Sequence, residues 1–148
     1  LEELIRTRCW LEEVALRESI RNRTVEWEEQ GVLSFHHLSR TERYLDDQSK
    51  TPNAKWSELH RAFHMTLIDG CNSHWMLGFC AQLDDQASRY CQLADEAGFI
   101  ERDSLKEHRL LMDAAIDGNA DEAIRIMLSH YNRTADIILN SDLKFFES

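Results

Sequence analysis

Proline and glycine are scarce in this chain of 148 residues, which has one proline and five glycines. Both residues interrupt regular helices, so their scarcity leaves long stretches free to be helical. The alternation of apolar and polar residues that marks strands is nearly absent, whereas apolar residues recur throughout with a spacing of 3.6 residues. The sequence contains no low-complexity segment and no clear internal repeat. These features predict one all-α domain.

Basic residues are also under-represented, with 17 lysines and arginines against 27 acidic residues and a formal net charge of −10. Such a surface repels phosphate backbones, so the chain by itself is expected to bind nucleic acid poorly. No run of about 18 apolar residues is present, and we expect no membrane span. The chain has no signal peptide and no initiator methionine, and it begins at Leu1 within a helical pattern. We therefore expect it to be a piece of a longer protein.

Cysteine pairs of the Cys-x-x-Cys type are absent. The four cysteines all lie in or beside helical patterns, where a free thiol behaves as a small apolar side chain: Cys9, Cys71, Cys80 and Cys91. A secreted disulfide-rich domain is usually smaller and richer in loops. We therefore predict reduced thiols and a cytoplasmic protein.

Six helices are predicted from periodicity and from helix-capping residues. Pro52 lies in the clearest loop, Gly70 is the expected left-handed residue after the third helix, and Ser104 opens a capping-box pattern. The expected ranges are Leu1–Arg21, Thr24–Gln48, Ala54–Asp69, Asn72 or Ser73 to Gly98, Ser104–Gly118 and Asn119–Leu139. Short connections between successive helices favour an antiparallel bundle.

Histidine interrupts the apolar faces of three of these helices. His60 and His64 lie one turn apart on the third helix, His108 lies on the fifth, and His130 lies on the sixth. The apolar stripes that contain them are Trp56, Phe63 and Leu67; Leu105, Met112 and Ala115; and Ala123, Met127, Thr134 and Ile137. A single inward histidine is more often a core residue satisfied by a neighbour. Because four converge from three helices, we favour a shared divalent metal ion, with zinc first and nickel or iron as alternatives.

Arg8 is a second interruption of an apolar face, on the first helix between Leu4 and Leu11. One interpretation is a pair with Glu12 at i,i+4, with the guanidinium reaching water. The other is an anion clamp, because a guanidinium matches a carboxylate through two parallel hydrogen bonds. The sequence does not choose between them. His36, His37 and His74 lack a shared inward face, so we expect them on the surface or in packing contacts.

Catalytic patterns are missing around these histidines. A metalloprotease of the His-Glu-x-x-His type needs a glutamate after its first histidine, and here that neighbour is Arg61. No nucleophile elbow, phosphate loop or paired Glu-x-x-His pattern occurs. The sequence therefore predicts a ligand-binding site without a catalytic group, and we do not expect an enzyme.

The order and spacing of several short segments resemble the FCD domain, the C-terminal effector-binding domain of FadR-type regulators in the GntR family of bacterial transcription factors. The Arg-x-x-x-Glu pattern of Arg8 and Glu12 matches the first helix of that family. The other matching segments are Phe63 and His64, Leu67, Cys71–Ser73, Glu107–Arg109, Ala114–Ala120, Ala123 and His130. The segments Thr7–Cys9, Ala15–Arg17, His36–Arg40 and Ser88–Tyr90 look most like the branch of the CsiR-type repressors.

This resemblance implies more than the composition shows. It implies that residues 1–148 form an FCD domain of six or seven helices that dimerises. An N-terminal winged helix-turn-helix that binds operator DNA would lie outside this chain. Many FCD domains hold a divalent metal and bind a small organic acid near it. Residue by residue, the metal ligands fall on His64, His108 and His130, and the arginine that meets the effector falls on Arg8.

His60 departs from the common form of the family, which has an aspartate at this position one turn before His64. A neutral ring in place of a carboxylate raises the charge of the site by one unit and favours metals that prefer nitrogen. Alternatively, His60 swings outward and leaves three histidines with open positions. We therefore predict a domain that senses an acid, most simply a dicarboxylate that bridges the metal and Arg8. The rival hypotheses are a small metal-dependent enzyme acting on a carboxylate and a purely structural dimerisation domain.

Overall fold

The structure, a computed structural model, describes residues 1–49, 51–96 and 104–140. Its helices are α1 Glu2–Arg21, α2 Val25–Ser39, α3 Ala54–Ile68, α4 His74–Glu96, α5 Ser104–Ile116 and α6 Ala120–Leu139. Two short strands, β1 Tyr44–Asp46 and β2 Thr51–Pro52, pair antiparallel, and η1 Asp69–Cys71 is a single 3-10 turn. The prediction of an all-α bundle is confirmed.

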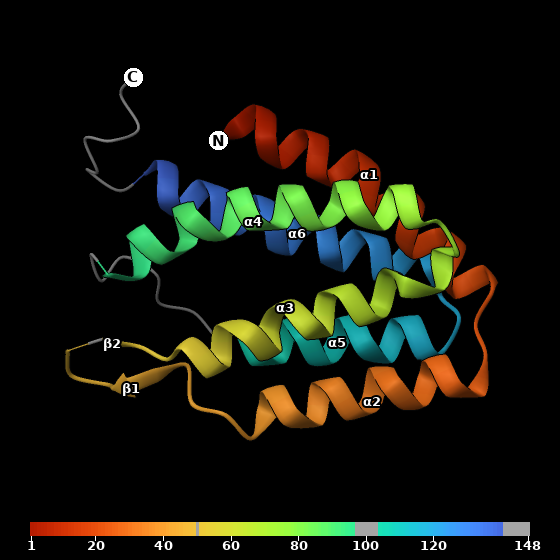
Figure 1. The fold of residues 1–148 in the computed structure, drawn as a ribbon, viewed down its shortest axis with the longest axis horizontal. Coiled ribbons are helices and arrows are strands. Elements are labelled where there is room, and N and C mark those ends of the chain that lie inside the picture. Colours follow the sequence, from red (N-terminus) through yellow and green to blue (C-terminus); the bar gives the residue numbers. More distant parts are fainter. Residues whose placement is uncertain (50, 97–103, 141–148) are drawn as a thin grey trace.

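The helices form two groups that face each other across the core (Figure 1). Helices α1, α4 and α6 lie together in the upper part of the view, and α2, α3 and α5 lie in the lower part. The pair α5 and α6 joins the groups, as does the contact between α1 and α3. The helices that carry the inward histidines therefore come from both groups, α3 and α5 from one and α6 from the other.

Side chains at the helix ends explain where several helices begin. The Thr24 hydroxyl accepts a hydrogen bond from Trp27 N, and the Asn119 side chain accepts one from Glu122 N. Ser73 does the same for Met76 N before α4. Each of these bonds satisfies one of the amides that a helix leaves open at its start. The N-caps expected at Thr24 and Asn119 are therefore confirmed, and of the two residues expected before the fourth helix, Asn72 or Ser73, it is Ser73 that accepts the bond.

Two local predictions are wrong. The helix expected to reach Gln48 ends at Ser39, because the Ser39 and Thr41 hydroxyls donate back to carbonyls of its last turn, and the chain then enters the β1–β2 hairpin. The left-handed residue after α3 is Asn72, with φ 58°, and not Gly70. Gly70 is needed for space instead, since an added Cβ would lie 3.2 Å from the Ser19 Cα. The predicted end of the fourth helix at Gly98 lies outside the described residues.

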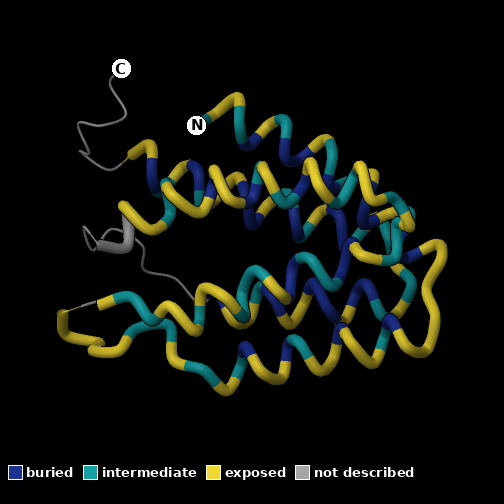
Figure 2. The backbone as a smooth tube through the Cα atoms, viewed as in Figure 1, coloured by how far each residue is buried: buried dark blue, intermediate teal, exposed yellow. Residues whose placement is uncertain are grey.

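The core follows the inward faces of the helices, and Figure 2 shows the buried positions turned toward the space between the two groups. Phe63 is completely buried on α3, and its ring centroid lies 5.9 Å from that of Phe35 on α2. Burying a side chain of this size contributes about 1.5–3 kcal/mol. The expected apolar stripes are largely confirmed, except that Leu105 is exposed at the start of α5.

Candidate metal centre and its ion-pair network

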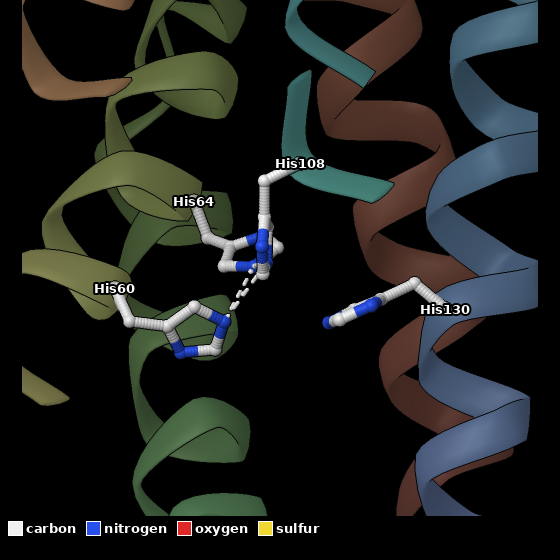
Figure 3. A group of neighbouring side chains, drawn as sticks. All are labelled: His60, His64, His108 and His130. Carbon is white, nitrogen blue, oxygen red and sulfur yellow. Dashed lines mark hydrogen bonds between the residues drawn. The ribbon is translucent and has the colours of Figure 1, made fainter. Parts of the chain in front are cut away.

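Four histidines from three helices meet in the bundle interior (Figure 3). His60 and His64 project from α3, His108 from α5 and His130 from α6. One ring nitrogen from each of the four lies within 4.8 Å of the corresponding atom of every other. The predicted convergence is thus present in the structure, and it includes His60, whose ring faces the other three instead of swinging outward.

Three of the ring nitrogens are especially close. The Nε2 atoms of His60, His64 and His108 are 3.0–3.1 Å from one another. Two nitrogens that are each about 2.1 Å from one ion lie about 3.0–3.4 Å apart, for ligand angles between a right angle and the tetrahedral angle. The cluster therefore has the donor type and spacing that a nitrogen-preferring divalent metal requires.

The charge state of the rings agrees with this role. Burial, followed by the neighbouring imidazoles, holds the pKa of His60 and of His64 well below the ordinary value of 6.5. The rings are therefore neutral at physiological pH, and a neutral imidazole has one nitrogen with a lone pair. Only neutral rings can ligate a metal ion.

Hydrogen bonds on the far side of two rings set which nitrogen faces the cluster. His130 Nδ1 donates to the Glu107 carboxylate at 2.7 Å, because a carboxylate only accepts. The Tyr131 hydroxyl donates to Glu12 at 3.0 Å and therefore accepts from His64 Nδ1 at 3.2 Å. In both rings the proton lies on Nδ1, which leaves the Nε2 lone pair directed at the other histidines.

His60 is fixed by stacking. The Trp56 ring lies parallel to it, with centroids 4.7 Å apart and an interplanar angle of 11°. On the Trp56 ring, the Arg43 guanidinium carbon lies 4.7 Å from the ring centroid. The column of Arg43, Trp56 and His60 joins the end of the β1–β2 hairpin to the histidine cluster.

Arg8 lies at the centre of a second, charged group. Its Nε donates to Glu12 and its Nη2 donates to Asp84 on α4, both at 2.6 Å. All three side chains are buried. Tyr131 covers the guanidinium, with the Arg8 Cζ 4.0 Å from the ring centroid. Because Tyr131 also contacts His64, this ion-pair network is joined directly to the histidine cluster.

Burial acts on the pKa values within this network. Burial alone disfavours the Arg8 charge, but Tyr131, Glu12 and Asp84 around it raise its pKa above the usual range. Burial raises the pKa of Glu12, and Arg8 and Tyr131 offset only part of that effect. Burial likewise raises the pKa of Tyr131 well above 10.0, so its hydroxyl keeps its proton.

The geometry modifies both interpretations of Arg8. The expected i,i+4 pair with Glu12 is present, but the guanidinium is buried and does not reach bulk water. Asp84 is a second carboxylate partner that the sequence did not indicate. Asp84 also pairs with Arg61, which in turn pairs with Asp85. An anion at Arg8 would therefore share the guanidinium with two carboxylates of the chain.

A cavity of about 430 Å³ opens beside both groups. His60, His130 and Arg8 line it, together with Asp84 and Tyr131. A ligand in this cavity would have access to the histidine cluster and to the arginine at the same time. His36, His37 and His74 are exposed, as expected, and take no part in this cluster.

Sequence reasoning did not identify Glu107, Tyr131 or Asp84 as site residues. Glu107 adjoins His108, and its second oxygen accepts from Arg133. Tyr131 follows His130, and adjacent helical positions point in different directions, so Tyr131 reaches His64 and Glu12 while His130 reaches the cluster. Asp84 falls on the buried face of α4, where a lone acidic residue is a signal of the same kind as Arg8.

Among the described helices, none is long and apolar enough to cross a membrane.

Comparisons with known proteins agree with the architecture. The chain matches the FCD domain family over residues 3–133. It is 32% identical over 139 residues to the HTH-type transcriptional regulator BphR of Paraburkholderia xenovorans, covering 93% of this chain and 56% of that protein. It is 28% identical over 109 residues to the HTH-type transcriptional repressor GlaR of Escherichia coli, covering 71% of this chain and 49% of that protein.

A solved structure shows the same fold. A GntR family transcriptional regulator from Pseudomonas syringae pv. tomato superposes with a TM-score of 0.77 at 16% sequence identity, covering 92% of this chain and 54% of that one. This chain therefore spans about half the length of the relatives that it matches.

Proposed function

Because this chain belongs to the FCD domain family of GntR-type transcriptional regulators, we propose that it senses a small organic acid at a metal centre and transmits its binding to operator recognition. The resemblance seen in the sequence is confirmed. The relatives are regulators by name, and the domain belongs to a regulatory and not an enzymatic class. What this domain binds is the subject of the proposal.

The observation that carries the proposal is the convergence of four buried or half-buried imidazoles from three helices. His60, His64, His108 and His130 would hold one divalent metal ion per chain. Four nitrogen donors favour zinc, with nickel or iron as alternatives. When bound, the ion supplies a positive centre that attracts a carboxylate oxygen.

The chain's own residues prepare this site. Glu107 and Tyr131 hold the protons of His130 and His64 on the nitrogens that face away from the cluster. His60 and His130 line the cavity, so an acid there would lie against the ligand set. Arg8 lines the same cavity and is the proposed partner of the acid, although it also serves Glu12 and Asp84.

Regulation would follow from the coupling of acid binding to the arrangement of the helices. An acid that contacts residues of α1, α3, α4 and α6 binds best to one arrangement of these helices and thereby favours it. In the whole protein, which we propose to be cytoplasmic, that arrangement would change operator binding through an N-terminal winged helix-turn-helix. Differential binding to the two arrangements is required, because a ligand with equal affinity for both shifts nothing.

We also propose that the domain forms a homodimer. Exposed aromatic side chains lie on α1 and α4, which pack against each other: Trp10 on α1, and Trp75 and Phe79 on α4. Aromatic residues are enriched at the centres of protein interfaces. Light scattering of the isolated domain at micromolar concentration should give twice the mass of 17.4 kDa, and a particle of 17.4 kDa alone would contradict dimerisation.

Metal analysis and ligand binding test the main proposal. Protein purified without a histidine tag should contain about one transition-metal ion per chain, whereas less than about a tenth of an ion after reloading with zinc and nickel would refute the metal centre. Acetate and larger acids should then raise the melting temperature of the zinc-loaded protein. The rival structural domain predicts no such shift, and the cavity beside the cluster argues against it.

A further inference from the structure

The cavity extends well beyond the histidine cluster along α6. His130 and Tyr131 line it at one end, and Thr134, Ala135 and Ile138 line it on successive turns toward the end of the helix. At a rise of 1.5 Å per residue, His130 and Ile138 are about 12 Å apart along the helix axis. The polar part of this wall is therefore at one end, and its far end is apolar.

Helices α1 and α4 also line the cavity, and on each of them the lining starts from a charged residue. On α1 the lining runs from Arg8 through Ile5 to the N-cap Leu1, and on α4 it runs from Asp84 through Ala87 toward Cys91, with the polar Ser88 and Gln92 beside them. The start of α1 and the ends of α4 and α6 lie at the same end of the bundle in Figure 1, on the side of the β1–β2 hairpin. The three helices thus form walls that extend in one direction for about 10 Å from the charged end, at 1.5 Å per residue, and that are apolar except at Thr134, Ser88 and Gln92.

The charged residues at the polar end of the cavity favour a ligand with a single carboxylate. Arg8 already pairs with two buried carboxylates, Glu12 and Asp84. One ligand carboxylate would also face the proposed metal ion at the histidine cluster, whereas a second one directed at Arg8 alone would lie beside both Glu12 and Asp84, and like charges in a buried site repel strongly. Further along the α1 and α6 walls, Ile5, Ala135 and Ile138 offer no hydrogen bond from their side chains. The polar residues of the α4 wall beyond Asp84, which are Ser88 and Gln92, carry no positive charge for a second carboxylate.

We propose that the ligand of this cavity is a monocarboxylic acid with an apolar body, its carboxylate toward the histidine cluster and Arg8 and its body between α1, α4 and α6. This inference rests on the proposed function and replaces the dicarboxylate expected from the sequence. The cavity of about 430 Å³ has the volume of roughly fourteen waters at about 30 Å³ each, more than a four-carbon acid fills. Pockets of this size bind ligands with substantial apolar surface.

The test compares octanoate with suberate, which has the same eight carbons and a second carboxylate in place of the terminal methyl group. Calorimetry of the zinc-loaded protein should show octanoate binding at least tenfold more tightly than suberate and more tightly than acetate. Equal or tighter binding of suberate would overturn this inference and leave the proposed function standing. Failure of all three acids, acetate included, to bind would overturn both.

Two variants locate the apolar body. Ala135→Leu places a larger side chain in the α6 wall and should weaken octanoate binding at least tenfold, with acetate affinity and zinc content within twofold of the parent. Ala62→Leu, at an exposed position of α3, is the matched control and should leave all three unchanged. If Ala135→Leu does not fold, Ala87→Leu makes the same change from the α4 wall. Unchanged octanoate affinity in a folded wall variant would overturn the inference.

Arg43→Gln tests the alternative that the ligand is a dicarboxylate. Arg43 lines the cavity at the hairpin and is a cation that the second carboxylate of a dicarboxylate could reach. Arg61 also lines the cavity, but it already pairs with Asp84 and Asp85. In Arg43→Gln, octanoate should still bind at least tenfold more tightly than suberate, because the inference gives the second carboxylate of suberate no partner at Arg43. A suberate affinity that exceeds that of octanoate in the parent and is lost in this variant would show that the ligand is a diacid, contrary to the inference.

Discussion

The phenol oxygen of Tyr131 lies 3.2 Å from His64 Nδ1, on the side of the imidazole away from the other histidines. The same hydroxyl donates to Glu12, which in turn pairs with Arg8. A single side chain thus joins the ion-pair network on α1 to a proposed metal ligand on α3. A shift of Arg8 on binding an acid would reach His64 through three hydrogen bonds, by way of Glu12 and Tyr131.

Tyr131→Phe should therefore weaken zinc binding by about 10–100-fold, because removal of the partner that orients a metal-ligating histidine typically has an effect of this size. Competition with a chromophoric chelator measures it. Tyr44→Phe, on the hairpin, makes the same chemical change outside the cluster and should leave zinc affinity unaltered. Equal zinc affinities in the two variants would mean that Tyr131 only packs against His64.

Arg8→Leu should lower the free energy of unfolding by about 3–5 kcal/mol, since it leaves the Glu12 carboxylate buried without its cation. Urea unfolding checks this value. The loss should shrink at acid pH, where Glu12 is protonated, and the double variant with Glu12→Gln should recover much of it. Arg125→Ala breaks the exposed pair with Glu122 and should change stability by less than about 1 kcal/mol.

Arg8→Lys keeps the positive charge but loses the planar fork that serves Glu12 and Asp84 together. Acid binding should weaken by about 1–3 kcal/mol, the range for a charge-assisted hydrogen bond, with zinc content unchanged. Calorimetry with acetate on zinc-loaded protein decides the matter. Identical acetate affinities in Arg8→Lys and the parent would assign Arg8 a structural role alone.

Removal of the metal should expose a pH dependence of stability. The pKa values of His60 and His64 in the folded chain lie well below 6.5, chiefly because of burial. As the pH falls through 6.5, the unfolded chain therefore takes up protons that the folded chain does not, and stability decreases. Thermal unfolding of chelator-treated protein should show a falling melting temperature between about pH 7.5 and pH 5.5. His60→Phe should reduce the slope, and a slope unchanged in this variant would argue against a contribution from the cluster.

Gly118→Ala should destabilise the protein by about 1–2 kcal/mol, because alanine is disfavoured in the left-handed region. Gly118 has φ +76°, and an added Cβ would lie 2.8 Å from the Arg23 guanidinium. Gly31→Ala is the matched control within α2, where the added Cβ makes an ordinary contact with Leu67 at 3.7 Å. It should be neutral or stabilising by up to about 1 kcal/mol. A comparable loss in both variants would contradict a backbone origin for the effect.

Sequence features that act within a few residues, such as helix caps, predicted the helices well. They did not identify which side chains pair between helices. The caps at Thr24 and Asn119 act within a few residues of the chain, so the sequence is sufficient to place them. The end of α2 was predicted wrongly because no proline or glycine marks a helix end between Ser39 and Pro52. In the structure, the Ser39 and Thr41 hydroxyls bond to carbonyls of the last turn of α2 instead of allowing the helix to continue. Arg43 then contacts Trp56.

In the candidate site, too, residues within one helix were predicted and partners on other helices were not. His60 and His64 were found because their spacing is a property of one helix. Asp84 was not found, because its partner Arg8 is 76 positions away and only the packing of α1 against α4 joins them. Tyr131 was overlooked because a tyrosine on a buried face looks like any aromatic core residue, and its hydrogen bonds depend on two other helices.

The stack of Trp56 on His60 gives this molecule an optical reporter of its own. The Trp56 ring centroid lies 4.7 Å from that of His60, a proposed metal ligand, which is close enough for the indole emission to respond to an ion bound at the cluster. Trp10 and Trp75 are exposed, so an aqueous quencher suppresses their emission selectively. The remaining signal comes from Trp56 and the buried Trp27, and only Trp56 stacks on a histidine of the cluster. Metal binding at the proposed centre can therefore be followed by tryptophan fluorescence in the intact chain, without an added label.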